Sequence, residues 1–266
     1  MEWPELRDEV RSVWDDNAAF WDNHVGEEGN VFARTLVYPT SERLLEPQPG
    51  WRVLEIACAN GNFARRIAPQ VAHVLATDIS PQMIEIAKAR TPDTITNVEF
   101  RTLDAADPDA LAAVTEQSFD AAVCNMAIMD MPAIEPMLAA FRRLLKPGGR
   151  FVFTTMHPCF NSGAITRMVE TSDEGGVFRT IYSIKSSHYH TPRHFLGLAV
   201  ADQPRPQYYF HRSFSDLFAP CFANGFVLDA LEEPVFREGN PERALSLANF
   251  AELPPVLAVR LRLLAN

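Results

Sequence analysis

The stretch that most constrains the fold of this chain runs from residue 51 to residue 68 and has the sequence WRVLEIACANGNFARRIA. The apolar run at 53–56 is followed by five small or polar residues, 57–61, and then by the start of an apolar helical face. Small residues let a ligand approach the backbone, and the first turn of a helix offers unpaired N–H groups. The stretch therefore predicts a strand, a turn and a helix that form a nucleotide-type site.

Such a unit also occurs for packing reasons alone, so the spacing of the later strands matters. A second apolar run, at residues 73–77, ends in Asp78, about twenty residues after the turn. Doubly wound α/β folds place an acidic side chain at this spacing, against ribose hydroxyls of the ligand. Later apolar runs end in Asp104 and Asn125. Polar residues at successive strand ends favour a parallel sheet that binds a ligand along that edge.

In five segments the chain resembles the class I S-adenosylmethionine-dependent methyltransferases. The matching segments are VLEIACANG (53–61), ATDIS (76–80), RTLDAAD (101–107), FDAAVCNMAI (119–128) and LLKPGGRFVFTT (144–155). The resemblance implies an α/β fold with a Rossmann-like, doubly wound sheet of seven strands, mostly parallel with one antiparallel edge strand. It also implies S-adenosyl-L-methionine as cofactor and S-adenosyl-L-homocysteine as product. Ala57 and Ala59 stand where the family usually has glycine.

We predict four parts in the chain. They are an N-terminal helical lid (1–49), a Rossmann-like core that binds S-adenosylmethionine (50–156), an inserted β-rich substrate cap (157–212) and a C-terminal segment that completes the core sheet (213–266). The lid prediction rests on an amphipathic helical pattern at 5–24. The cap prediction rests on the long separation between the fifth strand and the next helix, with strand-like pieces at 178–184 and 207–211.

The resemblance implies a set of cofactor-binding residues in the matching segments. Glu55 is assigned to the methionine end, and Asp78 to the ribose, because Ser80 already supplies a cap for the following helix. Asp104 belongs to the adenine-side loop, with capping of the next turn as the alternative, and Met126 could instead be core filler. The full predicted set is Glu55, Ala57, Cys58, Ala59, Gly61, Asp78, Ile79, Asp104, Ala105, Asn125 and Met126.

His157 directly follows the fifth predicted strand, where cofactor and acceptor should meet. Histidine suits general-base catalysis near neutral pH, and a structural histidine is the competing interpretation. His24 is the second candidate base. Tyr38 either faces the cofactor or acceptor or packs with its hydroxyl in water. The predicted acceptor-binding residues are Phe20, Trp21, Tyr38, Tyr189, Tyr209 and Arg212.

The composition narrows the partners. A net charge of −10 and a pI near 5.2 argue against nucleic acid, which is bound through clustered Lys and Arg. The four cysteines show no metal-site or disulfide spacing, and His188, His190 and His194 fit no ordinary metal site, so we predict no metal. No apolar run is long enough for a membrane span, and no secretory signal is evident. We therefore expect a cytoplasmic protein of unknown oligomeric state.

The sequence thus predicts an enzyme that transfers a methyl group from S-adenosylmethionine to a small organic acceptor. O-methylation is favoured, and secondary metabolism is one setting for it. Two alternatives stay open. The first is an enzyme that binds S-adenosylmethionine but catalyses a cyclisation or rearrangement. The second is a non-catalytic S-adenosylmethionine-binding domain, for which Ala57 and Ala59 are the one hint.

Overall fold

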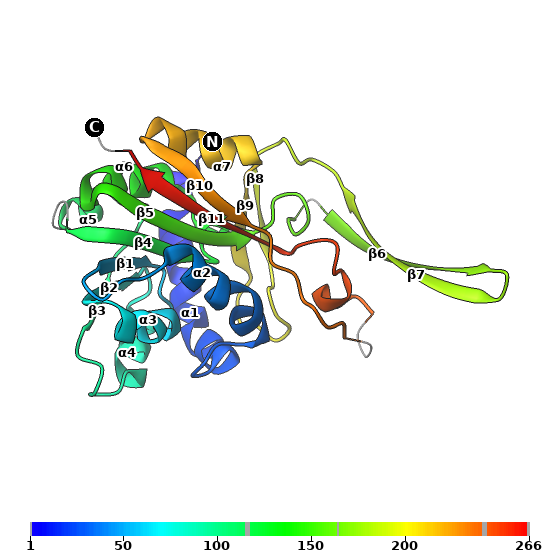
Figure 1. Cartoon of the computed structure of the whole chain (residues 1–266), viewed down its shortest axis with the longest axis horizontal. Coiled ribbons are helices and arrows are strands. Elements are labelled where there is room, and N and C mark those ends of the chain that lie inside the picture. The colour runs from blue at the N-terminus through cyan, green and yellow to red at the C-terminus, as the bar shows by residue number, and fades with distance from the viewer. Residues whose placement is uncertain (1, 115–117, 164, 241–243, 265–266) are drawn as a thin grey trace.

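The computed structural model describes residues 2–114, 118–163, 165–240 and 244–264. Its centre is a seven-stranded sheet with the order β10-β11-β5-β4-β1-β2-β3 (Figure 1). The strands are β1 (Arg52–Ile56), β2 (His73–Asp78), β3 (Val98–Thr102), β4 (Phe119–Asn125), β5 (Leu145–Met156), β10 (Phe226–Glu232) and β11 (Val256–Leu263). β5, β4, β1, β2 and β3 pair in parallel, whereas β11, which lies next to the edge strand β10, runs antiparallel to both of its neighbours, β5 and β10. The predicted fold class is confirmed.

Helices cover both faces of the sheet because successive strand residues point to opposite sides. Leu54 lies on the face of the sheet that α5, α6 and α7 cover. Its neighbour Val53 lies on the opposite face, which α2, α3 and α4 cover. These helices are α2 (Tyr38–Leu45), α3 (Asn62–Ile67), α4 (Pro81–Arg90), α5 (Pro108–Ala112), α6 (Glu135–Leu144) and α7 (Phe214–Ala223). Short 3-10 turns are η1 (Pro4–Leu6), η3 (Ala68–Gln70), η4 (Ile128–Asp130) and η5 (Leu247–Asn249).

The N-terminal segment forms the predicted helix as α1 (Arg7–Val25). This helix packs against α4 and against β9 (Gln207–His211). A π-helical turn, η2 (Ala33–Val37), follows it and leads into α2. Across the described ranges, every helix is too short or too polar to cross a membrane.

The segment between β5 and α7 forms two hairpins, not one compact unit. β8 (Arg193–Gly197) pairs with β9 close to the main sheet, whereas β6 (Ile165–Glu174) and β7 (Val177–Ser186) form an arm that projects away from the body (Figure 1). The arm is anchored near its base, where Tyr182 packs on Phe250. The strand-like pieces expected at 178–184 and 207–211 are present as β7 and β9. Their partner strands were not expected.

Candidate active site

A cavity of about 650 Å³ lies at the carboxyl ends of β1, β2 and β4. Glu55, Asp78 and Asn125, from the ends of these three strands, line its floor. Residues of α1 and η2 form one wall, and residues of the β8–β9 hairpin form another. The volume lies within the range of small-molecule sites, and the position is the one that ligands take in open α/β sheets.

The turn after β1 holds two alanines in the left-handed region, Ala57 with φ 56° and Ala59 with φ 48°. This conformation costs an L-residue about 1–2 kcal/mol. The hydrogen bond from the Cys58 N–H to the Thr77 carbonyl (2.9 Å) helps to hold the turn. Gly61 also has positive φ, and a Cβ there would lie 2.9 Å from the Phe100 ring. The turn is therefore held in a strained conformation at the cavity wall.

Asp78, at the end of β2, is buried and held at both carboxylate oxygens. Oδ1 accepts from the Ser80 N–H and Oδ2 from the Ala59 N–H, each at 2.9 Å. Burial raises the pKa of Asp78 to about 6, although these backbone hydrogen bonds oppose the shift. Ser80 caps α4 with its hydroxyl, as expected. The remaining lone pairs of Asp78 are available to donors in the cavity, such as a vicinal diol.

Glu55 is 2% exposed, and its Oε2 has no hydrogen-bond partner among the described residues. Burial raises its pKa to about 8, while the charge of Arg65 acts in the opposite direction. A buried carboxylate oxygen without a partner is rare in native structures and calls for a ligand, water or ion. Glu55 therefore suits a ligand that brings a cation or a hydrogen-bond donor to the end of β1.

The other strand ends add polar groups of fixed orientation. Asp104 accepts a hydrogen bond from the Ala106 N–H and pairs with Arg7 of α1 at 3.5 Å. Asn125 accepts from the hydroxyls of Ser41 and Thr154, which leaves its Nδ2 without a protein partner in the described ranges. A donor is thus held beside the acceptors Glu55 and Asp78.

The cavity brings most of the predicted residues together. Those that line it are Glu55, Ala57, Cys58, Ala59, Asp78, Ile79, Asp104, Ala105, Asn125, Met126, Trp21, His24, Tyr38 and Tyr209. Those that do not line it are Gly61, Phe20, Tyr189, Arg212 and His157. Phe20 stacks on His24 with ring planes 3° apart, so it supports the lining histidine from behind.

The Tyr38 hydroxyl does not lie in water, which was the alternative position for it. The hydroxyl hydrogen-bonds with Asn62, and burial raises its pKa to about 12. The ring packs 5.7 Å from that of Phe63, and the side chain lines the cavity. Tyr38 therefore belongs to the wall of the site.

His157 occupies a structural position. Its Nδ1 accepts from the Cys159 N–H at 3.1 Å, so its Nε2 carries the proton and donates to Glu233 at 2.8 Å. The ring is 1% exposed, lies 4.5 Å from Phe160, and has a pKa lowered by burial. Both nitrogens are engaged away from the cavity, which fits the structural alternative that the sequence left open.

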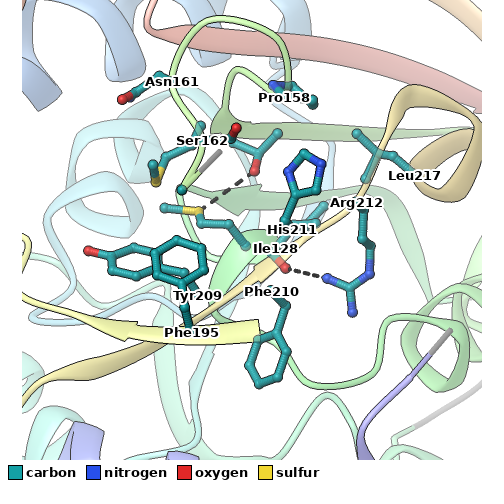
Figure 2. Close-up of a pocket in the computed structure, with 14 residues that line it drawn as sticks. Ile128, Pro158, Asn161, Ser162, Phe195, Tyr209, Phe210, His211, Arg212 and Leu217 are labelled. Carbon is teal, nitrogen blue, oxygen red and sulfur yellow. Dashed lines mark hydrogen bonds between the residues drawn. The ribbon is translucent and has the colours of Figure 1, made fainter. Parts of the chain in front are cut away.

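Arg212 and Tyr189 also serve the framework. Arg212 is buried and donates to the carbonyl of Ile128 (Figure 2). It also donates to the carbonyl of Met131, and the two bonds fix the segment after β4. The Tyr189 hydroxyl accepts from the Phe214 N–H at the start of α7. Neither side chain is free to bind an acceptor in the main cavity.

A small recess of about 30 Å³ adjoins the cavity and shares part of its wall. Figure 2 shows Phe195 and Tyr209 side by side at this wall, and their rings stack at 5.3 Å with planes 22° apart. Met129 lies there as well and accepts a hydrogen bond from Thr155. This end of the site is therefore largely apolar and aromatic.

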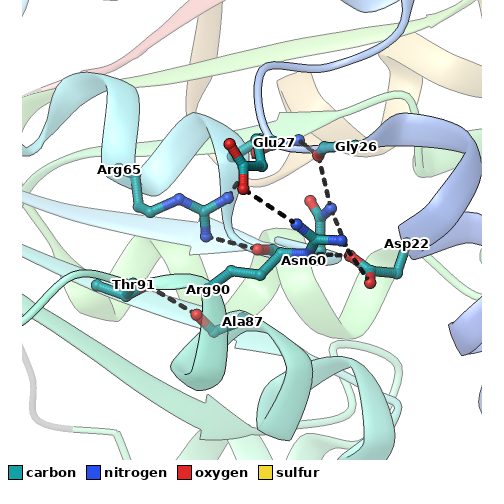
Figure 3. Close-up of polar contacts among 9 residues, drawn as sticks. Asp22, Gly26, Glu27, Asn60, Arg65, Ala87, Arg90 and Thr91 are labelled. Carbon is teal, nitrogen blue, oxygen red and sulfur yellow. Dashed lines mark hydrogen bonds and ion pairs between the residues drawn. The ribbon is translucent and has the colours of Figure 1, made fainter.

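A polar network ties the end of α1 to the turn after β1 (Figure 3). Asn60 donates to the Asp22 carboxylate and to the Gly26 carbonyl, at 3.0 and 3.1 Å. Arg90, at the end of α4, makes two hydrogen bonds to the same carboxylate. Burial raises the pKa of Asp22, but the bonds from Arg90 and Asn60 outweigh it, so the pKa lies below its ordinary value. The network therefore joins the end of α1 to the turn after β1 and to the end of α4.

Sequence reasoning missed several cavity residues, among them Asp130, Gln207, Asn161 and Phe195. One of them had a visible signal, because Asp130 is an acidic residue inside the apolar run MAIMDMP. The others come from the insertion, whose place in space the sequence pattern does not give.

Residues 53–149 match a family model described as a methyltransferase domain. A protein named ubiquinone biosynthesis O-methyltransferase from Xanthomonas oryzae pv. oryzae is 32% identical over 108 residues, which cover 41% of this chain and 44% of that protein. A second protein of that name, from Xylella fastidiosa, is 31% identical over 140 residues, 53% of this chain and 55% of its own length. The chain thus spans about half the length of the curated relatives it matches.

Solved structures share the fold over most of the chain. An S-adenosylmethionine-dependent methyltransferase from Mesorhizobium loti has a TM-score of 0.67 at 24% identity, covering 84% of this chain and 96% of its own. The [4+2]-cyclase SpnF has a TM-score of 0.62 at 15% identity, covering 98% and 97%. At these identities the likeness concerns the fold, and the fold hosts more than one reaction.

Proposed function

We propose that this protein, in which residues 53–149 form a methyltransferase domain, transfers the methyl group of S-adenosylmethionine to a hydroxyl of a small organic acceptor. The observation that carries the proposal is the cavity at the ends of β1, β2 and β4, which is lined by two buried carboxyl groups, those of Glu55 and Asp78. The chain matches about half the length of its curated relatives, and their name, O-methyltransferase, favours oxygen as the methylated atom.

The residues present fit S-adenosylmethionine. The Glu55 oxygen without a partner lies where the ligand's ammonium group would be bound, and Asp78 is held ready to accept from ribose hydroxyls. Asp104 and Ala105 line the side expected to bind adenine, and Met126 lines the cavity after β4. Two left-handed alanines shape the turn that the ligand would approach.

When bound, S-adenosylmethionine supplies a methyl group that its positive sulfonium already activates. The chain's own residues then have to hold the acceptor oxygen in line, exclude water and accept a proton. The α1 wall, tied down through Asp22, and the β8–β9 hairpin exclude water from two sides. His24 lines the cavity and stays a candidate to orient the acceptor.

We further propose that the protein is cytoplasmic and that it binds small molecules and not nucleic acid. The four cysteines are free thiols, as expected in a reducing compartment. The acidic net charge of −10 disfavours a nucleic-acid backbone as substrate.

Calorimetric titration with S-adenosylmethionine and S-adenosylhomocysteine tests the proposal. Asp78→Asn removes a charged hydrogen-bond acceptor, a change of about 1.5–3 kcal/mol, so we expect affinity to fall about tenfold or more. Asp120→Asn is the matched control, because Asp120 lies at the opposite end of β4 and bonds to Arg52 and Lys146. If folded wild-type protein binds neither compound, the proposal is overturned. If it binds them and converts an acceptor without adding a methyl group, the cyclisation alternative replaces it.

A further inference from the structure

One buried acidic residue in the cavity has no role in binding S-adenosylmethionine as proposed. Asp130 ends the short turn η4 after β4, is 6% exposed, and lines the cavity. It follows Asn125 and Met126 in the chain, so it continues the wall that begins at the end of β4. A carboxyl group so deeply buried is costly unless it is paired or used.

The protein fixes one oxygen of this carboxyl group and leaves the other unused. Gln203 donates to the Gln207 side-chain oxygen at 3.1 Å, which turns the Gln207 amide nitrogen toward Asp130. That nitrogen donates to Asp130 Oδ1 at 3.2 Å. Within the described residues, the bond from Gln207 is the one hydrogen bond of this carboxyl group, and Asp130 forms no ion pair. The side chain is therefore oriented by a hydrogen bond and has no cationic partner.

The residues around Asp130 indicate which kind of ligand can bind beside its second carboxyl oxygen. Met129, Met131 and Met156 line the same cavity, together with the stacked rings of Phe195 and Tyr209. Sulfur and aromatic side chains favour an apolar or aromatic ligand body. A few polar groups in an otherwise apolar wall, here Asp130 with Gln207, are the arrangement that fixes orientation in small-molecule sites.

We propose that Asp130 is the catalytic base of the methyl transfer and selects a phenol-like acceptor, with its carboxylate taking the proton of the acceptor hydroxyl. The inference rests on the proposed function. The acceptor O–H bond breaks and its proton goes to Asp130. The oxygen forms a bond to the methyl carbon, while the carbon–sulfur bond breaks and leaves its electron pair on sulfur. Charge balances, since the cationic sulfonium and the anionic carboxylate both end neutral.

The electrostatics agree with this role. Burial raises the pKa of Asp130 well above its ordinary value, and the bond from Gln207 only partly offsets the shift. The titratable groups that face it are Tyr209 from β9 and Cys124 from β4, and neither supplies a positive charge. Once ionised, a carboxylate deprived of water and of cations is a stronger base and so is better matched to a phenol. Its basic form is populated only as the pH rises through this raised pKa.

Methyl transfer to a series of simple phenols of falling pKa, ending with 4-nitrophenol, tests the inference. Asp130→Asn keeps the size and can keep the Gln207 contact but cannot take a proton. For weakly acidic phenols we expect kcat to fall about 10²-fold or more, the usual contribution of a general base. The loss should shrink toward 4-nitrophenol, which ionises without help. Affinity for S-adenosylmethionine, measured by calorimetry, should stay within twofold, as in the Asp120→Asn control.

The outcomes separate this inference from the function on which it rests. Wild-type transfer to phenols with an undiminished rate in Asp130→Asn overturns the base and leaves the methyltransferase proposal standing. A rate loss equal for every phenol makes Asp130 a structural residue and also overturns the base. If wild-type protein binds S-adenosylmethionine but methylates no phenol, both O-methylation of this acceptor class and the role of Asp130 are overturned.

Discussion

Replacing Glu55 by glutamine should change how stability depends on pH. The pKa of Glu55 is raised from 4.5 to about 8 in the folded protein, chiefly by burial. The folded chain therefore keeps this proton at pH values where the unfolded chain has lost it. The resulting stabilisation is complete below the unfolded pKa and is lost as the pH rises through the folded pKa. In wild-type protein, stability should fall between about pH 5 and pH 8 on account of this group.

The size of the effect follows from linkage. One proton held by the folded state alone changes stability by about 1.4 kcal/mol per pH unit, or about 3 kcal/mol from pH 5.5 to pH 7.5. For a chain of this size that corresponds to about 5–10 °C in melting temperature. Glu55→Gln cannot ionise, so its melting temperature should fall less over that interval by about this amount.

Thermal unfolding followed by circular dichroism across that pH range, without ligand, measures the difference in slope. The slope matters more than the absolute value, because the glutamine amide leaves a buried group unpaired at every pH. Glu99→Gln is the matched control, since Glu99 is an exposed residue of β3 that pairs with Arg101. Parallel curves for wild type and Glu55→Gln would refute the reasoning, because the pKa of Glu55 would then be close to its unfolded value.

Two further predictions concern the framework and the N-terminal segment. His157→Ala should cost about 1–3 kcal/mol of stability, because the Cys159 N–H loses its buried acceptor and Glu233 loses its donor. We expect kcat toward an accepted phenol to change by less than about threefold; a hundredfold loss of kcat in folded protein that binds S-adenosylmethionine normally would restore His157 as the base. Arg90→Ala should weaken S-adenosylmethionine binding about tenfold, because Asp22 loses its two bonds to α4 and then holds the Asn60 side chain of the turn less firmly. Lys88→Ala, which removes only an exposed pair with Glu85 on the same helix, should leave binding unchanged, and equal affinities of the two variants in calorimetry would show that the network does not support the cofactor site.

The part of the site built on backbone position could be predicted from the sequence. Glu55 and Asp78 lie at the ends of buried strands, and the alternation of strand residues together with the order of the sheet determines where those ends meet. A residue placed by its strand needs no knowledge of distant contacts. The predicted cofactor residues accordingly line one cavity, apart from Gly61.

The part that depends on side-chain direction could not be predicted in this way. The position of His157 after β5 was correct, but its ring is turned by the Cys159 N–H and by Glu233, which is 76 residues away in the sequence. Asp130 shows the converse, since its role depends on Gln207 from the insertion. The β6–β7 arm gave a weak signal for a related reason: Phe178 is 79% exposed, so no core imposes a pattern there.

Three of the six described non-glycine residues with positive φ lie where the sheet meets the cavity. Ala57, Ala59 and Met126 all have positive φ and all line it. Such conformations persist only where neighbouring contacts determine them, and here the strand ends do so. The Met126 N–H donates to the Thr154 carbonyl, and the Ala59 N–H donates to Asp78, each at 2.9 Å. The bond from the Ala59 N–H to Asp78 helps to hold the strained turn and, together with the bond from the Ser80 N–H, orients the carboxylate. The geometry of the turn and the orientation of Asp78 are therefore coupled through this shared contact, so a change at either should alter binding at both.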